Sequence, residues 1–200
     1  MNRILFYGDS NTYGYDPRSY LGGRYPASVR WTDRLMEYGK GHWEILPYGM
    51  NGRCIPQMDH DRKLLDLMLE EAGRIDLFAC MLGTNDIFLT GHPDAMAAKK
   101  RMDAFAAYLK ESSAIGKVLL IAPPAADPDQ TADRMLKRYL TEARRLSGIY
   151  RRIADDLGIE FADAGAWNIP LEYDSVHFSM EGHSVFADEM KNVLKRIFPW

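Results

Sequence analysis

The chain has 200 residues, of which 46% are hydrophobic and 26% charged, and its formal net charge is -3. This composition predicts one globular domain over residues 1–200, large enough to bury about 70% of the surface of the unfolded chain. The small negative charge gives no electrostatic basis for binding nucleic acid. No apolar run approaches the ~20 residues of a membrane span, and the N-terminal residues lack the pattern of a secretory signal. We therefore expect a cytoplasmic protein that does not contact a membrane.

In chain order, short apolar runs typical of buried strands alternate with longer stretches of helical spacing. The predicted elements are a strand at 4–7, a helix at 28–38, a strand at 43–47, a helix at 57–72, a strand at 75–82, a helix at 94–110, a strand at 117–122, a helix at 131–157, a strand at 159–162 and a helix at 179–197. This alternation predicts parallel strands joined by right-handed crossovers. The expected fold is a three-layer α/β/α sandwich with a flavodoxin-like, five-stranded parallel sheet.

Small polar residues follow the predicted strands, at the edge where an open parallel sheet binds its ligands. The segments at these strand ends are 8–11, 49–53, 83–86, 123–124 and the stretch from 163 to 177. Because the carboxyl ends of parallel strands meet at one edge, we expect these segments to converge there.

Ser10, in Gly8-Asp9-Ser10-Asn11, is a candidate nucleophile that needs a base. His177 can serve as that base, and Asp174, three residues earlier, can accept a hydrogen bond from its Nδ1. The alternatives stay open at this stage: Ser10 as a helix N-cap, and Asp174 with His177 as a surface pair. Ser184 also lies in a serine motif, but within a helical pattern rather than after a strand, so we reject it.

Three donors could stabilise an oxyanion next to Ser10, each of a type found in serine hydrolases. They are the backbone N–H groups of Ser10 and Gly52 and the side-chain amide of Asn85. The structural alternatives are that Gly52 is a turn residue and that Asn85 or Asp86 caps a helix. The basic stretch 99–101 lies in a helical pattern and is interpreted as a solvated helix face.

The segments 8–11, 49–53, 83–86 and 174–177 together resemble the four motif blocks of the SGNH (GDSL-like) hydrolases, in order and in spacing. The nearest subgroup is the arylesterase-like acyl hydrolases and transferases. The resemblance implies a Ser10–His177–Asp174 triad, an oxyanion hole from Ser10, Gly52 and Asn85, and ester hydrolysis through an acyl-enzyme without metal or organic cofactor.

Two positions depart from the family pattern. Asn11 stands where the family name has leucine, and Cys54-Ile55 follows Arg53 where Thr-Thr is expected. The second departure makes that edge of the site less polar. A disulfide between Cys54 and Cys80 stays open, although two cysteines in a chain of this length form no disulfide framework.

We expect Tyr13, Tyr15, Arg53 and Cys54 to contact the substrate, a small-molecule ester. Aromatic side chains suit flat aryl groups or sugar faces, although ordinary loop packing explains the tyrosines equally well. No long apolar stretch is available for a fatty acyl chain, which favours acetyl to butyryl groups. The alternatives are a thioesterase, lysophospholipase or carbohydrate deacetylase with the same triad, and a non-catalytic flavodoxin-like binding module. Exposed aromatics suggest self-association into a homo-oligomer.

Overall fold

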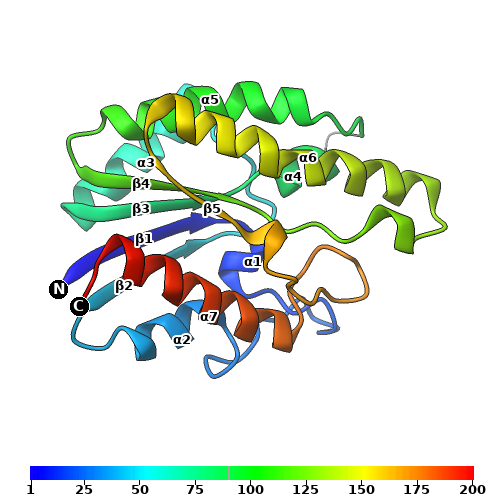
Figure 1. The fold of residues 1–200 in the computed structure, drawn as a ribbon, viewed down its shortest axis with the longest axis horizontal. Helices are drawn as coiled ribbons and strands as arrows, with labels where there is room; N and C mark the ends of the chain where they lie inside the picture. The colour runs from blue at the N-terminus through cyan, green and yellow to red at the C-terminus, as the bar shows by residue number, and fades with distance from the viewer. Residues whose placement is uncertain (90) are drawn as a thin grey trace.

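The computed structural model describes residues 1–89 and 91–200, and its centre is a parallel sheet of five strands (Figure 1). The strands are β1 (Asn2–Gly8), β2 (Trp43–Gly49), β3 (Ile75–Met81), β4 (Ile115–Ala122) and β5 (Glu160–Asp163). Their order across the sheet, β2-β1-β3-β4-β5, is the order of a flavodoxin-like doubly wound sheet. The predicted fold class is therefore confirmed, and each predicted strand overlaps the observed one.

Five long helices cover the two faces of the sheet (Figure 1). They are α2 (Trp31–Tyr38), α3 (Asp59–Ala72), α5 (Ala95–Glu111), α6 (Arg134–Leu157) and α7 (Met180–Ile197). Two short helices that the sequence analysis did not predict, α1 (Ser10–Tyr13) and α4 (Thr84–Phe88), directly follow β1 and β3. Short 3-10 turns occupy Pro128–Gln130 and Ala164–Ala166.

The alternation of side chains along each strand divides the core into two clusters. Leu5 and Tyr7 of β1 join the cluster formed with α3, α5 and α6, whereas Ile4 and Phe6 join the cluster formed with α2 and α7. Because both faces are covered, the central strands β1, β3 and β4 each contain a continuous apolar run, which is why the sequence indicated them as buried strands.

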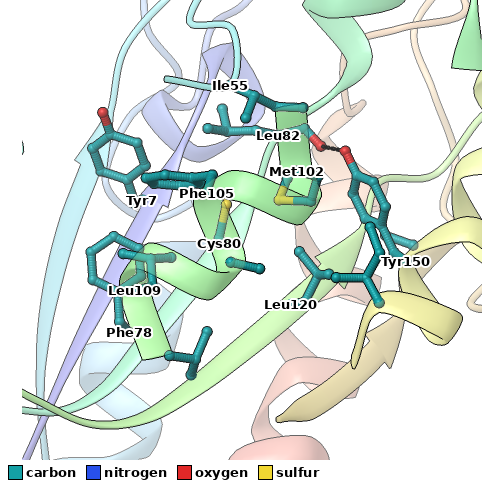
Figure 2. Packing of buried hydrophobic residues seen from close by; sticks show 14 of the residues in the cluster. Tyr7, Ile55, Phe78, Cys80, Leu82, Met102, Phe105, Leu109, Leu120 and Tyr150 are labelled. Atoms are coloured by element: carbon teal, nitrogen blue, oxygen red, sulfur yellow. Dashed lines mark hydrogen bonds between the residues drawn. The ribbon is translucent and has the colours of Figure 1, made fainter. Parts of the chain in front are cut away.

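Figure 2 shows the first cluster, where aromatic and aliphatic side chains of the sheet and of α5 and α6 interlock. The buried Tyr150 hydroxyl of α6 donates a hydrogen bond to the carbonyl of Leu82 at 3.0 Å. A Cβ at Gly83 would come within 2.3 Å of this hydroxyl, and the φ of Gly83 is +117°. Glycine is thus required at the turn from β3 into α4, which carries Asn85.

Candidate active site

Ser10 is the first residue of α1, directly beyond the end of β1. The helix is capped by Asp9, whose carboxylate accepts a hydrogen bond from the Asn11 N–H at 3.0 Å, so the interpretation of Ser10 as the N-cap is wrong. The Ser10 side chain is free of a capping role. Its backbone N–H lies in the first turn, where the helix itself offers no acceptor.

The loop before α7 brings Asp174 and His177 to Ser10. His177 Nε2 lies 3.0 Å from Ser10 Oγ, and His177 Nδ1 lies 2.6 Å from Asp174 Oδ2. Asp174 Oδ1 also accepts the backbone N–H groups of Val176 and His177, each at 3.0 Å. The turn between them passes through Ser175 with a φ of +62°. The Asp174 carboxylate is therefore directed at the His177 ring, and that ring is directed at Ser10 Oγ.

The environment of Asp174 keeps it ionised. Burial acts to raise its pKa, but the hydrogen bonds from the His177 ring and from the backbone amides of His177 and Val176 outweigh burial and lower the pKa to about 2. An ionised carboxylate accepts the Nδ1 proton of His177 and fixes that tautomer. The other ring nitrogen, Nε2, then faces the Ser10 hydroxyl.

Gly52 lies in a turn that is hydrogen-bonded to Asn85 of α4 through the neighbouring Arg53. The Asn85 side-chain amide donates to the carbonyl of Arg53 at 3.0 Å and has a second N–H to offer. Gly52 has a φ of +72° and lies in a turn, as the structural alternative held, and its N–H has no partner among the described residues. Asn85 and Asp86 lie inside α4, behind Gly83 at its N-cap, so the capping alternative for these two is wrong.

Asp86 of α4 fixes the segment that follows Gly52 through a hydrogen bond. Its fully buried carboxylate accepts the Ile55 N–H at 3.0 Å and pairs with Arg101 of α5 at 2.8 Å. The interpretation of Arg101 as part of a solvated face is therefore wrong. Sequence reasoning missed this pair because a helical pattern shows where a charged residue lies, but not which buried acid it can reach.

Arg53 makes its observed polar contacts to the backbone. Its guanidinium donates to the Gly8 carbonyl at 2.8 Å and to the Tyr48 carbonyl, and it stacks 4.1 Å above the Tyr7 ring. It joins the ends of β1 and β2, and burial lowers its pKa. Arg53 and Cys54 also line a cavity of about 350 Å³ beside Gly52. Cys54 and Cys80 are both free thiols, so no disulfide joins them.

Of the two tyrosines expected to contact substrate, Tyr15 lies at the site. Its ring centre is 4.8 Å from that of His177. Tyr13 instead lies beneath the guanidinium of Arg24, 4.6 Å from it, and accepts a hydrogen bond from Arg24 through its carbonyl. The structure therefore brings Tyr15 next to the imidazole and gives Tyr13 a partner within its own loop.

Asp9 is a second carboxylate of the site, and it is 2% exposed. Burial raises its pKa to about 6, although the hydrogen bond from the Asn11 N–H and the electrostatic influence of the nearby His177 and Arg53 side chains act in the opposite direction. Sequence reasoning gave Asp9 no role, although aspartate is a residue type favoured at helix N-caps. In the part of the chain that the structure describes, no group of three or more His, Cys, Asp or Glu is placed to hold a metal ion.

A serine hydroxyl, an imidazole and a carboxylate in series, at the carboxyl edge of a flavodoxin-like sheet, form the arrangement found in serine hydrolases. The chain belongs to the GDSL-like lipase/acylhydrolase family, whose model matches residues 6–185. It is a carboxylic ester hydrolase rather than a non-catalytic binding module. A comparison with curated proteins gives no match. None of the helices described in the structure is long and apolar enough to cross a membrane.

Solved structures agree with this family. A candidate arylesterase from Agrobacterium tumefaciens strain C58 has a TM-score of 0.85 at 29% identity, covering 99% of this chain and 100% of its own. A carbohydrate acetylesterase from Sinorhizobium meliloti has a TM-score of 0.82 at 26% identity over the same shares. An aryl esterase from M. smegmatis, with a TM-score of 0.82, is only 22% identical over 99% of this chain and 100% of its own, and shows the fold alone.

The raised pKa of Asp9 predicts a pH-dependent cost to stability. Because the folded state holds this proton more tightly than the unfolded chain, ionising Asp9 destabilises the fold as the pH rises from 3.8 to about 6. Asp9→Asn cannot ionise. The unfolding free energy of the variant minus that of wild type should therefore grow over this range, by up to about 3 kcal/mol, and level off above it.

Urea titrations of both proteins at half-unit steps from pH 4 to 7.5 measure this difference. His183, whose pKa burial lowers to about 4, contributes an opposite slope, but it is present in both proteins and cancels. A difference that stays constant across the range would show that Asp9 is not the group responsible.

Proposed function

We propose that Ser10 is the nucleophile, His177 the general base and Asp174 the residue that orients the imidazole. The observation that carries this proposal is the unbroken series of contacts from Asp174 through His177 to Ser10, at 2.6 and 3.0 Å. These lengths are within hydrogen-bond reach, which is the first requirement for proton transfer between the groups. The low pKa of Asp174 supports it, since an ionised carboxylate stabilises the imidazolium that forms.

In the proposed reaction, Ser10 Oγ attacks the ester carbonyl carbon while its proton moves to His177 Nε2. The oxyanion accepts hydrogen bonds from the N–H groups of Ser10 and Gly52 and from the Asn85 amide. Collapse of this intermediate breaks the bond to the alcohol, which takes the proton from Nε2. Water then attacks the acyl carbon while its proton moves to His177 Nε2. The bond between that carbon and Ser10 Oγ breaks, Oγ takes the proton back from Nε2, and the acid leaves. Where another alcohol replaces water, the same steps transfer the acyl group to it.

We propose that the substrate is an ester of a short acyl group, acetyl to butyryl, with an aryl, alkyl or sugar alcohol. The cavity of about 350 Å³ beside Gly52 is available for the acyl group. It is lined in part by Met50, Cys54, Leu64 and Met68. The Tyr15 ring beside His177 offers an aromatic face for the alcohol. The names of the two relatives above 25% identity agree with aryl and acetyl esters.

Carbohydrate deacetylation is a second candidate function. One relative above 25% identity is a carbohydrate acetylesterase. A second cavity, of about 500 Å³, lies beside the loop that carries Asp174, because Tyr173 and Ser175 line it together with polar side chains that include Gln130, Asn168 and Glu172. In the described residues no comparable observation favours a thioesterase or a lysophospholipase. The cytoplasmic location and the self-association expected from the sequence stay predictions.

The nucleophile is tested by labelling with a fluorophosphonate, which reacts with activated serines. Wild type should label at one equivalent per chain. Ser10→Ala should not label and should lose roughly 10⁴-fold or more of its turnover of p-nitrophenyl acetate. Ser184→Ala is the matched control, because Ser184 lies in α7 and pairs with Arg34, and it should label and turn over as wild type does. Labelling of Ser10→Ala would overturn the assignment.

The amide of Asn85 is expected to act on the transition state alone. Asn85→Ala should lower kcat by ~10²–10³ and leave KM nearly unchanged, because the missing donor faces an oxygen that becomes charged only during reaction. Steady-state kinetics on p-nitrophenyl acetate measure both constants. The exposed Asn192 of α7 provides the matched control, Asn192→Ala. An unchanged kcat would remove Asn85 from the oxyanion hole and leave the triad standing.

A panel of p-nitrophenyl acetate, butyrate and octanoate, with acetylated sugars and an acyl-CoA, tests the substrate class. Acetate and butyrate should give the highest kcat/KM, and octanoate a value roughly tenfold or more lower, since each methylene that fits poorly discriminates by about that factor. Higher kcat/KM for acetylated sugars than for aryl acetates would favour the second candidate. Preference for octanoate or for acyl-CoA would contradict the short-acyl ester proposal.

A further inference from the structure

Asn11, the residue after Ser10, connects the nucleophile to the loop of the base. Its Nδ2 donates to the carbonyl of Val176 at 3.1 Å, and its Oδ1 accepts the N–H of Phe178 at 2.9 Å. These two backbone groups belong to the residues immediately before and after His177. One buried amide, 5% exposed, therefore brackets the imidazole-bearing residue on both sides.

The backbone of Asn11 is held as firmly as its side chain. Its N–H donates to Asp9, the cap of α1, at 3.0 Å, and its carbonyl accepts the indole N–H of Trp31 at 2.9 Å. Trp31 is itself buried in the core between β1 and α7. The backbone of Asn11 is thus fixed to the core. Its side chain therefore holds the loop that carries His177 at a defined distance from that core.

The other backbone hydrogen bonds near His177 stay within its own loop. The His177 carbonyl accepts the Glu172 N–H at 2.7 Å, and the Pro170 carbonyl accepts the Ser179 N–H at 3.1 Å. These bonds shape the loop but do not set its distance from α1. Further ties, such as the hydrogen bond from Tyr25 to Glu172, reach the segment that precedes α2 rather than Ser10.

The two backbone groups require a side chain at position 11 that offers both a donor and an acceptor and is long enough to reach them. A carbonyl oxygen accepts only and an N–H donates only, so their partner must offer one donor and one acceptor. Leucine, of similar size, offers neither, and an ionised aspartate offers no donor. Asparagine is the side chain of this length that satisfies both groups, and the departure from the family's leucine thus acquires a physical reason.

We propose that Asn11 is a positioning residue that holds the His177 imidazole opposite Ser10 Oγ. The inference rests on the proposed function, because it acts through the Ser10–His177 pair. The chain closes a ring of contacts: Ser10 is bonded to Asn11, Asn11 holds Val176 and Phe178, and His177 between them returns to Ser10. Without the amide the loop keeps its shape, but its register against α1 is lost.

A double-mutant cycle between Asn11→Leu and His177→Ala tests this inference. In the wild-type background Asn11→Leu should lower kcat for p-nitrophenyl acetate on the order of 10²-fold, since small displacements of a catalytic group have effects of that size. KM should stay nearly unchanged. In the His177→Ala background the same substitution should change the residual kcat by less than about twofold, because the group that Asn11 positions is gone.

A merely structural role would lower activity by the same factor in both backgrounds, and that result would overturn the inference, as would a wild-type kcat in Asn11→Leu. If Asn11→Leu does not fold, Asn11→Ser replaces it, and the same comparison decides. Ser147→Ala is the matched control, because it removes a hydrogen bond between α6 and the end of β5, and it should leave kcat unchanged.

Ser10→Ala, measured in parallel, separates this inference from the proposed function. Full turnover by Ser10→Ala would overturn the proposed function and this inference with it. An inactive Ser10→Ala together with a fully active Asn11→Leu would overturn the role of Asn11 alone.

Discussion

The contact between His177 Nε2 and Ser10 Oγ, at 3.0 Å, is the constraint that the rest of the structure serves. The two residues are separated by 167 positions in the chain, so no local propensity can bring them together. The parallel sheet does so, because every strand ends at the same edge and the last loop must return over that edge to start α7. The fold brings the two segments to the same edge of the sheet, whereas hydrogen bonds across that edge set the distance between His177 Nε2 and Ser10 Oγ.

Those hydrogen bonds are mostly directed from side chains to backbone. Asn85 holds the Arg53 carbonyl, Asp86 holds the Ile55 N–H, and Arg53 holds the carbonyl of Gly8. Each contact joins the segment that follows β2 to the end of β1 or to α4, which follows β3. Buried charges such as Asp86 are costly unless paired, and the pair with Arg101 reduces that cost. The edge is thus built from satisfied polar groups, whose geometry is more directional than packing.

Much of this could be predicted from the sequence, and the reasons are specific. Strands covered on both faces appear as continuous apolar runs, so the five strands and the helices between them could be located. Once the strands were located, the glycine-containing segments at their carboxyl ends could be predicted to meet at one edge. Asn11 and Arg101 could not be assigned in this way. Their roles depend on which backbone group or carboxylate a side chain meets across the edge, and periodicity does not encode that direction. The cap of α1 could not be assigned from the sequence either: Asp9 caps this helix rather than Ser10.

The two carboxylates of the site differ in burial and in the hydrogen bonds that they accept, and together these differences separate their pKa values. Asp174 accepts one ring and two backbone N–H groups, and its pKa falls to about 2 despite partial burial. Asp9 is more deeply buried and accepts the Asn11 N–H, and its pKa rises to about 6. An acid that is ionised under nearly all conditions is suited to stabilise an imidazolium, since its charge does not depend on the proton that the imidazole takes up. Asp9 caps α1, and its higher pKa means that it loses its charge at a higher pH than Asp174 does. The same edge therefore holds two acids with different tasks: Asp174 supports the proposed base, and Asp9 caps the helix that carries the proposed nucleophile.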